Sequence, residues 1–247
     1  MKFAGIIAEY DPFHNGHAWQ LAQAKALGAE RVAVAMSCSL VQRGALPLLP
    51  EAVRTRSALT CGADLVFALP APCACAGAEA FARAGVALLA AAGCDGLVFG
   101  AETPDAALLM EAAELLDSDS YRAALKAQLA GGARSFAAAR QAAAAQLASD
   151  ERVAALLDKP NNNLAVEYCR AIRSLAPRME AYPLPRQGAD HGEALHSAHG
   201  QFASASALRK LWAEGGADAV APYVPEAVFP LYQEAYAAGQ YTDFSAA

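Results

Sequence analysis

The sequence lacks the features that would send the chain to a membrane or a secretory route. Its apolar start, 3–8, is followed at once by Glu9 and Asp11 and by no small-residue cleavage site, which argues against a signal peptide. The run 65–78 carries no charge, but Pro70 and Pro72 interrupt it and it is too short to cross a bilayer. We therefore expect a cytoplasmic protein with no membrane partner.

Paired cysteines and a general excess of positive charge are missing as well. The cysteines form no CxxC pair and lie among apolar neighbours, so we expect reduced, mostly buried thiols, without a disulfide framework or a zinc site. The formal net charge of -6 excludes a protein that is basic over its whole surface. A nucleic-acid partner would have to meet a local basic patch.

Apolar runs of strand length are present in the first part of the chain and recur once later. The first four are apolar throughout, as in strands covered on both faces, and helix-length segments separate the runs. The expected strands are 3–8, 31–37, 64–69, 96–100 and a weaker 179–184, and the expected helices are 17–27, 51–61 and 79–92. This alternation predicts an α/β fold with a doubly wound parallel sheet, in which ligands bind beyond the carboxyl ends of the strands.

An alanine-rich, strand-poor region, 104–158, follows the fourth expected strand. It predicts two or three helices with a break at Gly131 and Gly132. The segment 121–149 within it contains no acidic residue. Its basic residues are Arg122, Lys126, Arg134 and Arg140. A solvated helix face and a surface for an RNA backbone both explain this bias.

The stretch AEYDPFHNGHAWQ places His14 and His17 where the first expected strand gives way to a helix. The free backbone N–H groups at the start of that helix would face the carboxyl edge of the sheet and favour an anion. Two imidazoles beside them can donate to phosphate oxygens, and Gly16 leaves room for a ligand. Two histidines alone do not complete a zinc site. The pattern predicts a site for the phosphates of a nucleotide.

Two more polar segments stand at an expected strand end and before an expected helix. Gly100 and Glu102 follow the fourth strand, where a glycine lets a ligand approach the backbone; a plain turn is the alternative. The segment KPNNN, 159–163, is expected to be a loop, and asparagine-rich loops commonly bond to their own backbone.

A long polar loop follows the fifth expected strand and leads to a helix start with Ser204, Ser206 and Arg209. Hydroxyls, helix-end amides and a guanidinium form a phosphate-binding arrangement, and helix capping with a solvated arginine is the alternative. The loop itself contains Arg186, Gly188, Asp190 and His191, while His196 and His199 are assigned to loop surface. A further basic group near the expected site contains Gln42, Arg43 and Gly44, followed by Arg54 and Arg56, for which ligand contact and a surface role are both open.

These motifs together resemble a known family. HNGH is similar to the HxGH signature of the HIGH-type nucleotidylyltransferase superfamily. The segments GIIAEYDPFHNGH, VQRG, DLVFALP, GCDGLVFGAE, KPNNNLAVEY and SASALRK occur in the order seen in bacterial tRNA(Met) cytidine acetate ligases, over about 3–210. The resemblance implies a Rossmann-like fold, with the alanine-rich helices inserted or appended.

The resemblance also implies an activity and a set of contacts. Acetate and ATP would give acetyl-adenylate and pyrophosphate, and the acetyl group would pass to N4 of the wobble cytidine of elongator tRNA(Met), with Mg²⁺ expected beside ATP. His14 and His17 would stabilise phosphate charge during catalysis. The implied nucleotide contacts are Ile7, Ala8, Glu9, Tyr10, Phe13, Gly16, Gly100, Asn161 or Asn162, Arg186, Ser204, Ser206 and Arg209.

This chain departs from the family pattern on the acceptor side and in length. Cys38, Ser39 and Ala45 replace the usual residues, and position 11 is aspartate instead of asparagine. We expect a catalytic domain over 1–212 and, over 213–247, a C-terminal extension that is a remnant or the start of a tRNA-binding portion. Two rival functions share the site: nucleotidyl transfer to a small phosphorylated acceptor, and non-catalytic nucleotide or RNA binding.

Overall fold

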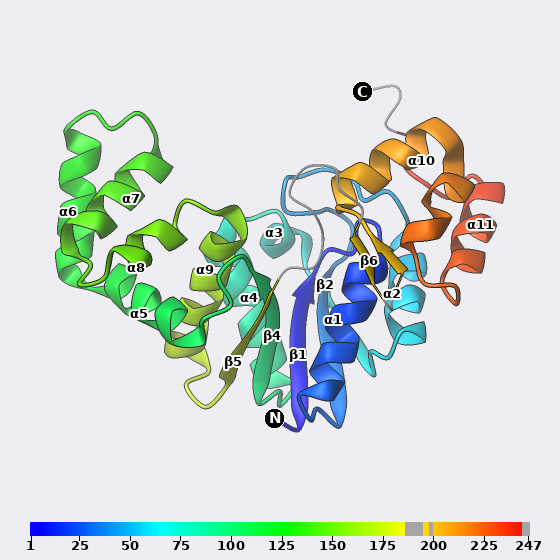
Figure 1. Ribbon diagram of the computed structural model, residues 1–247, viewed down its shortest axis with the longest axis horizontal. Helices are drawn as coiled ribbons and strands as arrows, with labels where there is room; N and C mark the ends of the chain where they lie inside the picture. The colour runs from blue at the N-terminus through cyan, green and yellow to red at the C-terminus, as the bar shows by residue number, and fades with distance from the viewer. Residues whose placement is uncertain (186–194, 198–199, 244–247) are drawn as a thin grey trace.

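A parallel sheet of five strands, in the order β3-β2-β1-β4-β5, forms the centre of the protein in the computed structural model (Figure 1). The structure describes residues 1–185, 195–197 and 200–243. The strands are β1 (Phe3–Ala8), β2 (Arg31–Ser37), β3 (Leu65–Leu69), β4 (Gly96–Ala101) and β5 (Glu180–Pro185). All five predicted strands are confirmed, and so is the doubly wound parallel α/β class.

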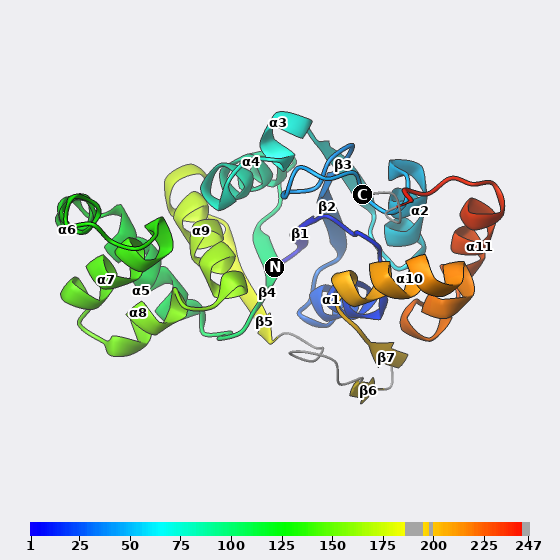
Figure 2. The same ribbon diagram turned by 90° about the horizontal axis from the view of Figure 1, so that it is seen from above.

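Helices cover both faces of this sheet, and its central strands β1, β2 and β4 are largely buried on both sides. Alternate residues of β1, such as Phe3 and Ile6, belong to two separate apolar clusters. On one face lie α4 (Ala78–Ala91) and α9 (Pro160–Leu175); on the other lie α1 (Asn15–Ala26) and α2 (Glu51–Thr60) (Figure 2). The chain reverses its winding between β1 and β4, which pair directly, and a parallel sheet of this type binds ligands at that point.

The alanine-rich region forms a lobe of four helices beside β5 (Figure 1), where the sequence predicted two or three. They are α5 (Ala106–Asp117), α6 (Asp119–Ala130), α7 (Phe136–Leu147) and α8 (Glu151–Leu156). The predicted break at Gly131 and Gly132 separates α6 from α7. Each helix has its own capping side chain, from Asp105, Ser118, Ser135 and Asp150, that accepts a hydrogen bond from a backbone N–H of the first turn.

Part of the basic bias in this lobe is structural. Arg140 donates to Glu167, a carboxylate that is 2% exposed and also accepts from Arg170 at 2.8 Å. Arg122 pairs with Asp119 on the surface. The buried pair means that Arg140 serves to link α7 to α9, and not to form an RNA-facing surface.

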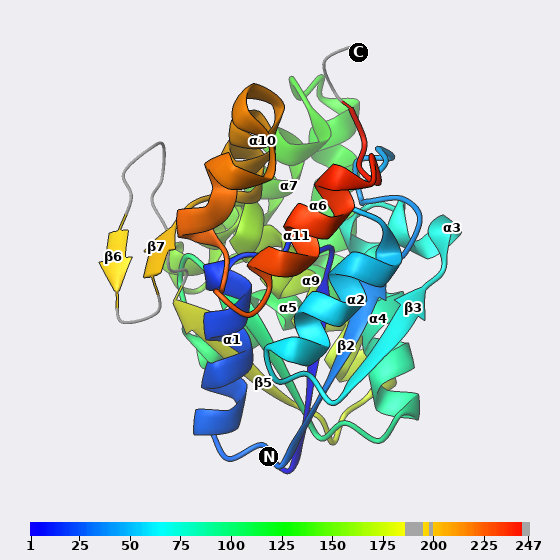
Figure 3. The same ribbon diagram turned by 90° about the vertical axis from the view of Figure 1, so that its right-hand side faces the viewer.

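The predicted boundary after residue 212 falls inside a helix, α10 (Ala205–Val220). Val220 and Tyr232 belong to the same apolar cluster as β1 and β2, and α11 (Phe229–Ala237) packs beside α2 (Figure 3). Tyr232 Oη donates to Phe13 O at 2.6 Å. The segment 213–243 therefore packs as part of the first domain, since its side chains complete one face of the sheet.

Two smaller expectations have different outcomes. All six cysteines are free, as predicted, but only Cys94 and Cys169 are buried, and the other four are partly exposed. Among the described residues, no helix has the length and apolar character needed to cross a membrane.

Candidate active site

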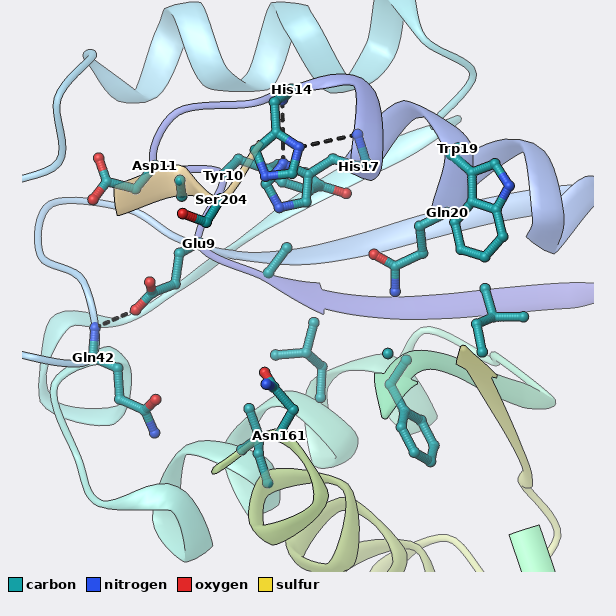
Figure 4. A pocket seen from close by; sticks show the side chains of 18 of the residues that line it. Glu9, Tyr10, Asp11, His14, His17, Trp19, Gln20, Gln42, Asn161 and Ser204 are labelled. Carbon is teal, nitrogen blue, oxygen red and sulfur yellow. Dashed lines mark hydrogen bonds between the residues drawn. The ribbon is translucent and has the colours of Figure 1, made fainter. Parts of the chain in front are cut away.

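A pocket of about 380 Å³ opens at the carboxyl edge of the sheet, where β1 and β4 lie side by side (Figure 4). Its walls come from the end of β1, the start of α1, the end of β4, the start of α9 and the start of α10. Predicted site residues that line it are Ile7, Ala8, Glu9, Tyr10, His14, Gly16, His17, Gly100, Asn161 and Ser204. Segments up to about two hundred positions apart in the chain thus meet in one cavity, as expected for this class of sheet.

His14 and His17 form the first turn of α1 and cap it with their rings. His14 Nδ1 accepts from Gly16 N at 3.0 Å, and His17 Nδ1 accepts from His14 N at 3.3 Å. The two rings stack with centroids 3.8 Å apart. Because both Nδ1 atoms accept backbone hydrogen bonds, the proton of each neutral imidazole lies on Nε2, which is then a donor.

This geometry corrects the predicted use of the helix start. The backbone N–H groups of His14 and Gly16 donate to imidazole nitrogens and are not available to a ligand. The sequence predicted that backbone N–H groups would bind the anion, whereas here the imidazole N–H groups are the donors for a ligand. A Cβ at Gly16 would lie 2.8 Å from His14 Cε1. Gly16 is therefore required by the capping ring, and the space that the sequence assigned to a ligand is occupied by His14.

The aromatic residues of this turn support the histidines from behind. The Tyr10 ring meets the rings of Phe13 and His17 edge to face, at centroid distances of 4.9 and 4.8 Å. Phe13 is fully buried and does not line the pocket, which changes its predicted role from nucleotide contact to packing. Burial raises the pKa of the Tyr10 hydroxyl, so this phenol stays neutral.

The KPNNN segment begins helix α9 at Pro160, where the sequence predicted a loop. Asn161 points into the pocket (Figure 4). Asn162 is instead fully buried and bonds to Thr103 through both polar atoms of its side chain. The Glu102 carboxylate accepts from Asn161 Nδ2 at 2.6 Å and from Asn162 N at 2.7 Å. Burial opposes ionisation of Glu102, but these hydrogen bonds outweigh it and hold the pKa of the carboxyl below its usual value.

The predicted phosphate-binding group at the start of α10 is only partly assembled at the pocket. Ser204 lines the cavity and caps α10, accepting from Ala207 N at 3.2 Å, whereas Ser206 lies outside the lining. Arg209 turns to Asp11, donating to its backbone oxygen at 2.6 Å and to Oδ2 at 3.1 Å. Arg186, Gly188, Asp190, His191 and His199 lie outside the described residues, and for His196 the structure gives only its backbone in β6 (Leu195–Ser197).

Asp11 is a buried junction that sequence reasoning missed. It is 2% exposed and accepts from Arg43 Nη2 at 2.5 Å and from Leu48 N at 2.6 Å, in addition to Arg209. This carboxylate ties the segment after β2 and the start of α10 to the end of β1. The aspartate at position 11 could be read in the sequence, but its partners lie up to 198 positions away.

Arg54 is neither a phosphate contact nor a surface residue. It is fully buried and donates to the carbonyl oxygens of Leu49, Glu9, Ser37 and Cys38. Burial lowers the pKa of its guanidinium, and the carboxylates of Asp11 and Glu51 oppose that shift. Its role is to hold the ends of β1 and β2 against the start of α2.

Of the remaining lining, only Gln42 was singled out in the sequence, with ligand contact left open, and most of the rest is apolar. The remaining lining consists of Asp11, Trp19, Gln20, Gln42, Phe81, Phe99, Leu164, Tyr168, Leu184, Pro185, Ala203 and Ala205. Gln20 lies three positions after His17, and residues at that spacing share one face of a helix. The sequence could therefore have predicted that Gln20 also lines the pocket. Gln42 donates its backbone N–H to Glu9 Oε1 at 2.6 Å. Within the described part of the chain, no group of three or more His, Cys, Asp or Glu side chains is placed to hold a metal.

The doubly wound sheet has a pocket at its switch point, and two imidazoles on the first turn of α1 line it. These features place the chain among the α/β proteins that bind ligands at the carboxyl edge of the sheet. The chain belongs to the HIGH Nucleotidyl Transferase family, whose model matches residues 1–246. The HNGH motif lies between the end of β1 and the first turn of α1, at the carboxyl edge of the sheet where this fold binds its ligands.

Curated relatives and solved structures agree with that membership. A tRNA(Met) cytidine acetate ligase of Syntrophotalea carbinolica is 41% identical over 218 residues, which is 87% of this chain and 52% of the relative. One of Caldanaerobacter subterraneus is 35% identical over 97% of this chain and 60% of the relative. The chain thus spans little more than half the length of these relatives.

Two crystal structures of Thermotoga maritima TmcAL share the fold. The form bound with alpha-thio ATP is 30% identical with a TM-score of 0.87, over 98% of this chain and 57% of that chain. The apo form is 32% identical with a TM-score of 0.89, over 98% of this chain and 58% of that chain.

Proposed function

We propose that this chain binds ATP in the pocket and activates acetate as acetyl-adenylate, in the manner of a tRNA(Met) cytidine acetate ligase. The observation that carries the proposal is the stacked pair His14 and His17, which both line the pocket and whose Nδ1 atoms both accept backbone hydrogen bonds, so that each Nε2–H is a donor. The names of the curated relatives, and the ATP analogue bound to the Thermotoga protein, support the same substrate.

In this proposal the triphosphate lies against the start of α1. The imidazole Nε2–H groups donate to oxygens of the α-phosphate and of the departing pyrophosphate, and Ser204 Oγ assists from the α10 side. The nucleoside follows the end of β1, from Ile7 to Tyr10, and passes Gly100 towards Asn161. Ser206 and Arg209 contribute through the start of α10 and through Asp11, since neither lines the cavity.

The chemistry needs no protein nucleophile. A carboxylate oxygen of acetate attacks the α-phosphorus, the bond from that phosphorus to the bridging oxygen breaks, and pyrophosphate leaves with the electron pair. The cytidine N4 amine then attacks the acetyl carbonyl, AMP leaves, and the amine proton passes to solvent. Positioning and neutralisation of charge account for the first step, because acetate is already an anion at neutral pH.

The proposal includes a Mg²⁺ ion bound to the phosphates of ATP. It usually takes one or two protein carboxylates and fills its other positions with phosphate oxygens and water. Glu9 is the carboxylate on the pocket wall that fits this role, since Asp11 is engaged by two arginines and a backbone N–H. When bound, the ion supplies neutralisation of phosphate charge.

Elongator tRNA(Met) is the proposed acceptor, and its phosphate backbone would meet exposed cations of the helical lobe. Lys126 and Arg134 are exposed on α6 and at the start of α7, in a segment without acidic residues. Cys38, Ser39 and Ala45, which depart from the family pattern, lie in the segment after β2 that also contributes Gln42 to the pocket.

Exchange of labelled pyrophosphate into ATP tests the first step. We expect exchange that depends on acetate, because only acetate carries the carboxylate that forms the mixed anhydride. Exchange supported by a small phosphorylated acceptor instead would favour nucleotidyl transfer. A protein that binds ATP but supports no exchange with either acceptor would be a binding module, and both results contradict the proposal.

A further inference from the structure

Two residues after β4 hold the start of α9 in a reciprocal set of hydrogen bonds. Glu102 Oε1 accepts from Asn161 N at 3.2 Å and from Asn161 Nδ2 at 2.6 Å, and Glu102 Oε2 accepts from Asn162 N at 2.7 Å. In the other direction, Thr103 N donates to Asn162 Oδ1 at 2.9 Å, and Asn162 Nδ2 donates to Thr103 Oγ1 at 3.1 Å. A single carboxylate thus serves two backbone N–H groups and one side chain.

These bonds close a long excursion of the chain. The four-helix lobe α5–α8 leaves the sheet after Thr103 and returns at Lys159, so the bonded residues are 59 or 60 positions apart in sequence. The bonds form at the carboxyl edge of β4, directly beside Gly100 and the pocket. The start of α9 is therefore fixed to the sheet at the point where Asn161 enters the cavity.

The carboxylate also fixes which way the Asn161 amide faces. An ionised carboxylate only accepts hydrogen bonds, and the hydrogen bonds that it receives hold the pKa of Glu102 low against the effect of burial. Asn161 must therefore turn Nδ2 towards Glu102, and Oδ1 is the amide atom directed away from that carboxylate. A glutamine at position 102 would remove this constraint, because its amide both donates and accepts.

We propose that Glu102 is a positioning residue of the nucleotide site, which acts on the ligand through the orientation of the Asn161 amide. The inference rests on the proposed function, because it takes ATP as the ligand of the pocket. Glu102 itself does not line the cavity. Its effect on binding must then pass through Asn161, and this distinguishes it from a residue that touches ATP.

A double-mutant cycle tests this coupling. Glu102→Gln and Asn161→Ala should each weaken ATP binding about tenfold, and the double variant should be no weaker than Asn161→Ala alone, since the amide through which Glu102 acts is then missing. Titration calorimetry with ATP measures the dissociation constants, at a temperature where circular dichroism shows every variant to be folded.

Asp105→Asn is the matched control. Asp105 is also a carboxylate that caps a helix of the same lobe, accepting from Leu108 N at 3.1 Å, but it does not line the pocket and does not bond to Asn161. We expect unchanged ATP affinity in Asp105→Asn, because an asparagine oxygen can still accept from Leu108 N and the change does not reach Asn161.

Three results would overturn the inference. Unchanged ATP affinity in Glu102→Gln would show that the carboxylate only caps α9. Independent, additive losses in the double variant would show that Glu102 acts by a route other than Asn161. Failure of the unaltered protein to bind ATP would overturn the proposed function and this inference together, whereas the first two results leave the proposed function intact.

Discussion

Replacing His17 with alanine should reduce acetate-dependent pyrophosphate exchange by about a hundredfold to a thousandfold, the usual cost of removing one donor that stabilises transition-state charge. The ring of His17 stacks on His14 at 3.8 Å and accepts from His14 N, so its loss also frees the neighbouring imidazole. The initial rate of exchange at saturating ATP and acetate measures the effect. An undiminished rate would remove His17 from the mechanism.

His17→Asn separates catalysis from capping. An asparagine oxygen can still accept from His14 N, so this variant should keep most of the helix stability that His17→Ala loses, which is about 1 kcal/mol for a capping residue. Both variants should lose exchange, because neither places an imidazole N–H at the phosphates. Lys25→Ala, at the other end of α1, is the control that should keep full exchange.

Replacing Arg54 with methionine should lower the free energy of unfolding by about 3–5 kcal/mol, as for a buried charged group removed from its partners. The guanidinium is fully buried and serves four carbonyl oxygens, those of Leu49, Glu9, Ser37 and Cys38. Methionine has a similar stem but no donor, so these acceptors are left in a dry interior. Urea denaturation measures the loss as a lower midpoint concentration at an unchanged m-value.

Arg56→Ala is the control on the same helix. Its side chain is 60% exposed, and its nearest carboxylate oxygen, Glu234 Oε2, is 3.7 Å away on another exposed residue. An exposed pair of this kind contributes less than about 1 kcal/mol. A loss in Arg54→Met no larger than that in Arg56→Ala would show that the buried network does not stabilise the fold.

The strand and helix order could be predicted because its signals are local. A strand covered on both faces is apolar throughout, as in β1, in β4 and in β2 after Arg31. In the lobe, Ser118 and Ser135 cap the starts of α6 and α7, and capping residues of this kind mark helix starts in a sequence. The prediction of two or three helices did not take these caps into account and was too low. The expected boundary after residue 212 followed the end of the last matching motif, SASALRK, and local sequence does not reveal which later side chains complete a distant core.

The choice between Asn161 and Asn162 shows where sequence reasoning stops. Both residues belong to the KPNNN motif, and the sequence left open which of them contacts the nucleotide. Adjacent residues on a helix point about 100° apart, so only one of the two can face the pocket. Only the placement of α9 against the end of β4 decides that Asn161 enters the pocket and that Asn162 is buried against Thr103. The same holds for Arg54 and Arg56, which are neighbours in sequence but differ completely in exposure.

By itself the sequence determined the α/β class, the order of the elements and the position of HNGH at the end of the first strand, because periodicity and turn residues act over a few positions. The tertiary structure decided which polar groups face the pocket and which form hydrogen bonds within the protein. His14 and His17 cap their own helix, Asp11 binds Arg209 across 198 positions, and Glu102 anchors Asn161 across 59. Such pairings depend on how distant segments pack, since burial and hydrogen-bond partners are properties of the folded chain.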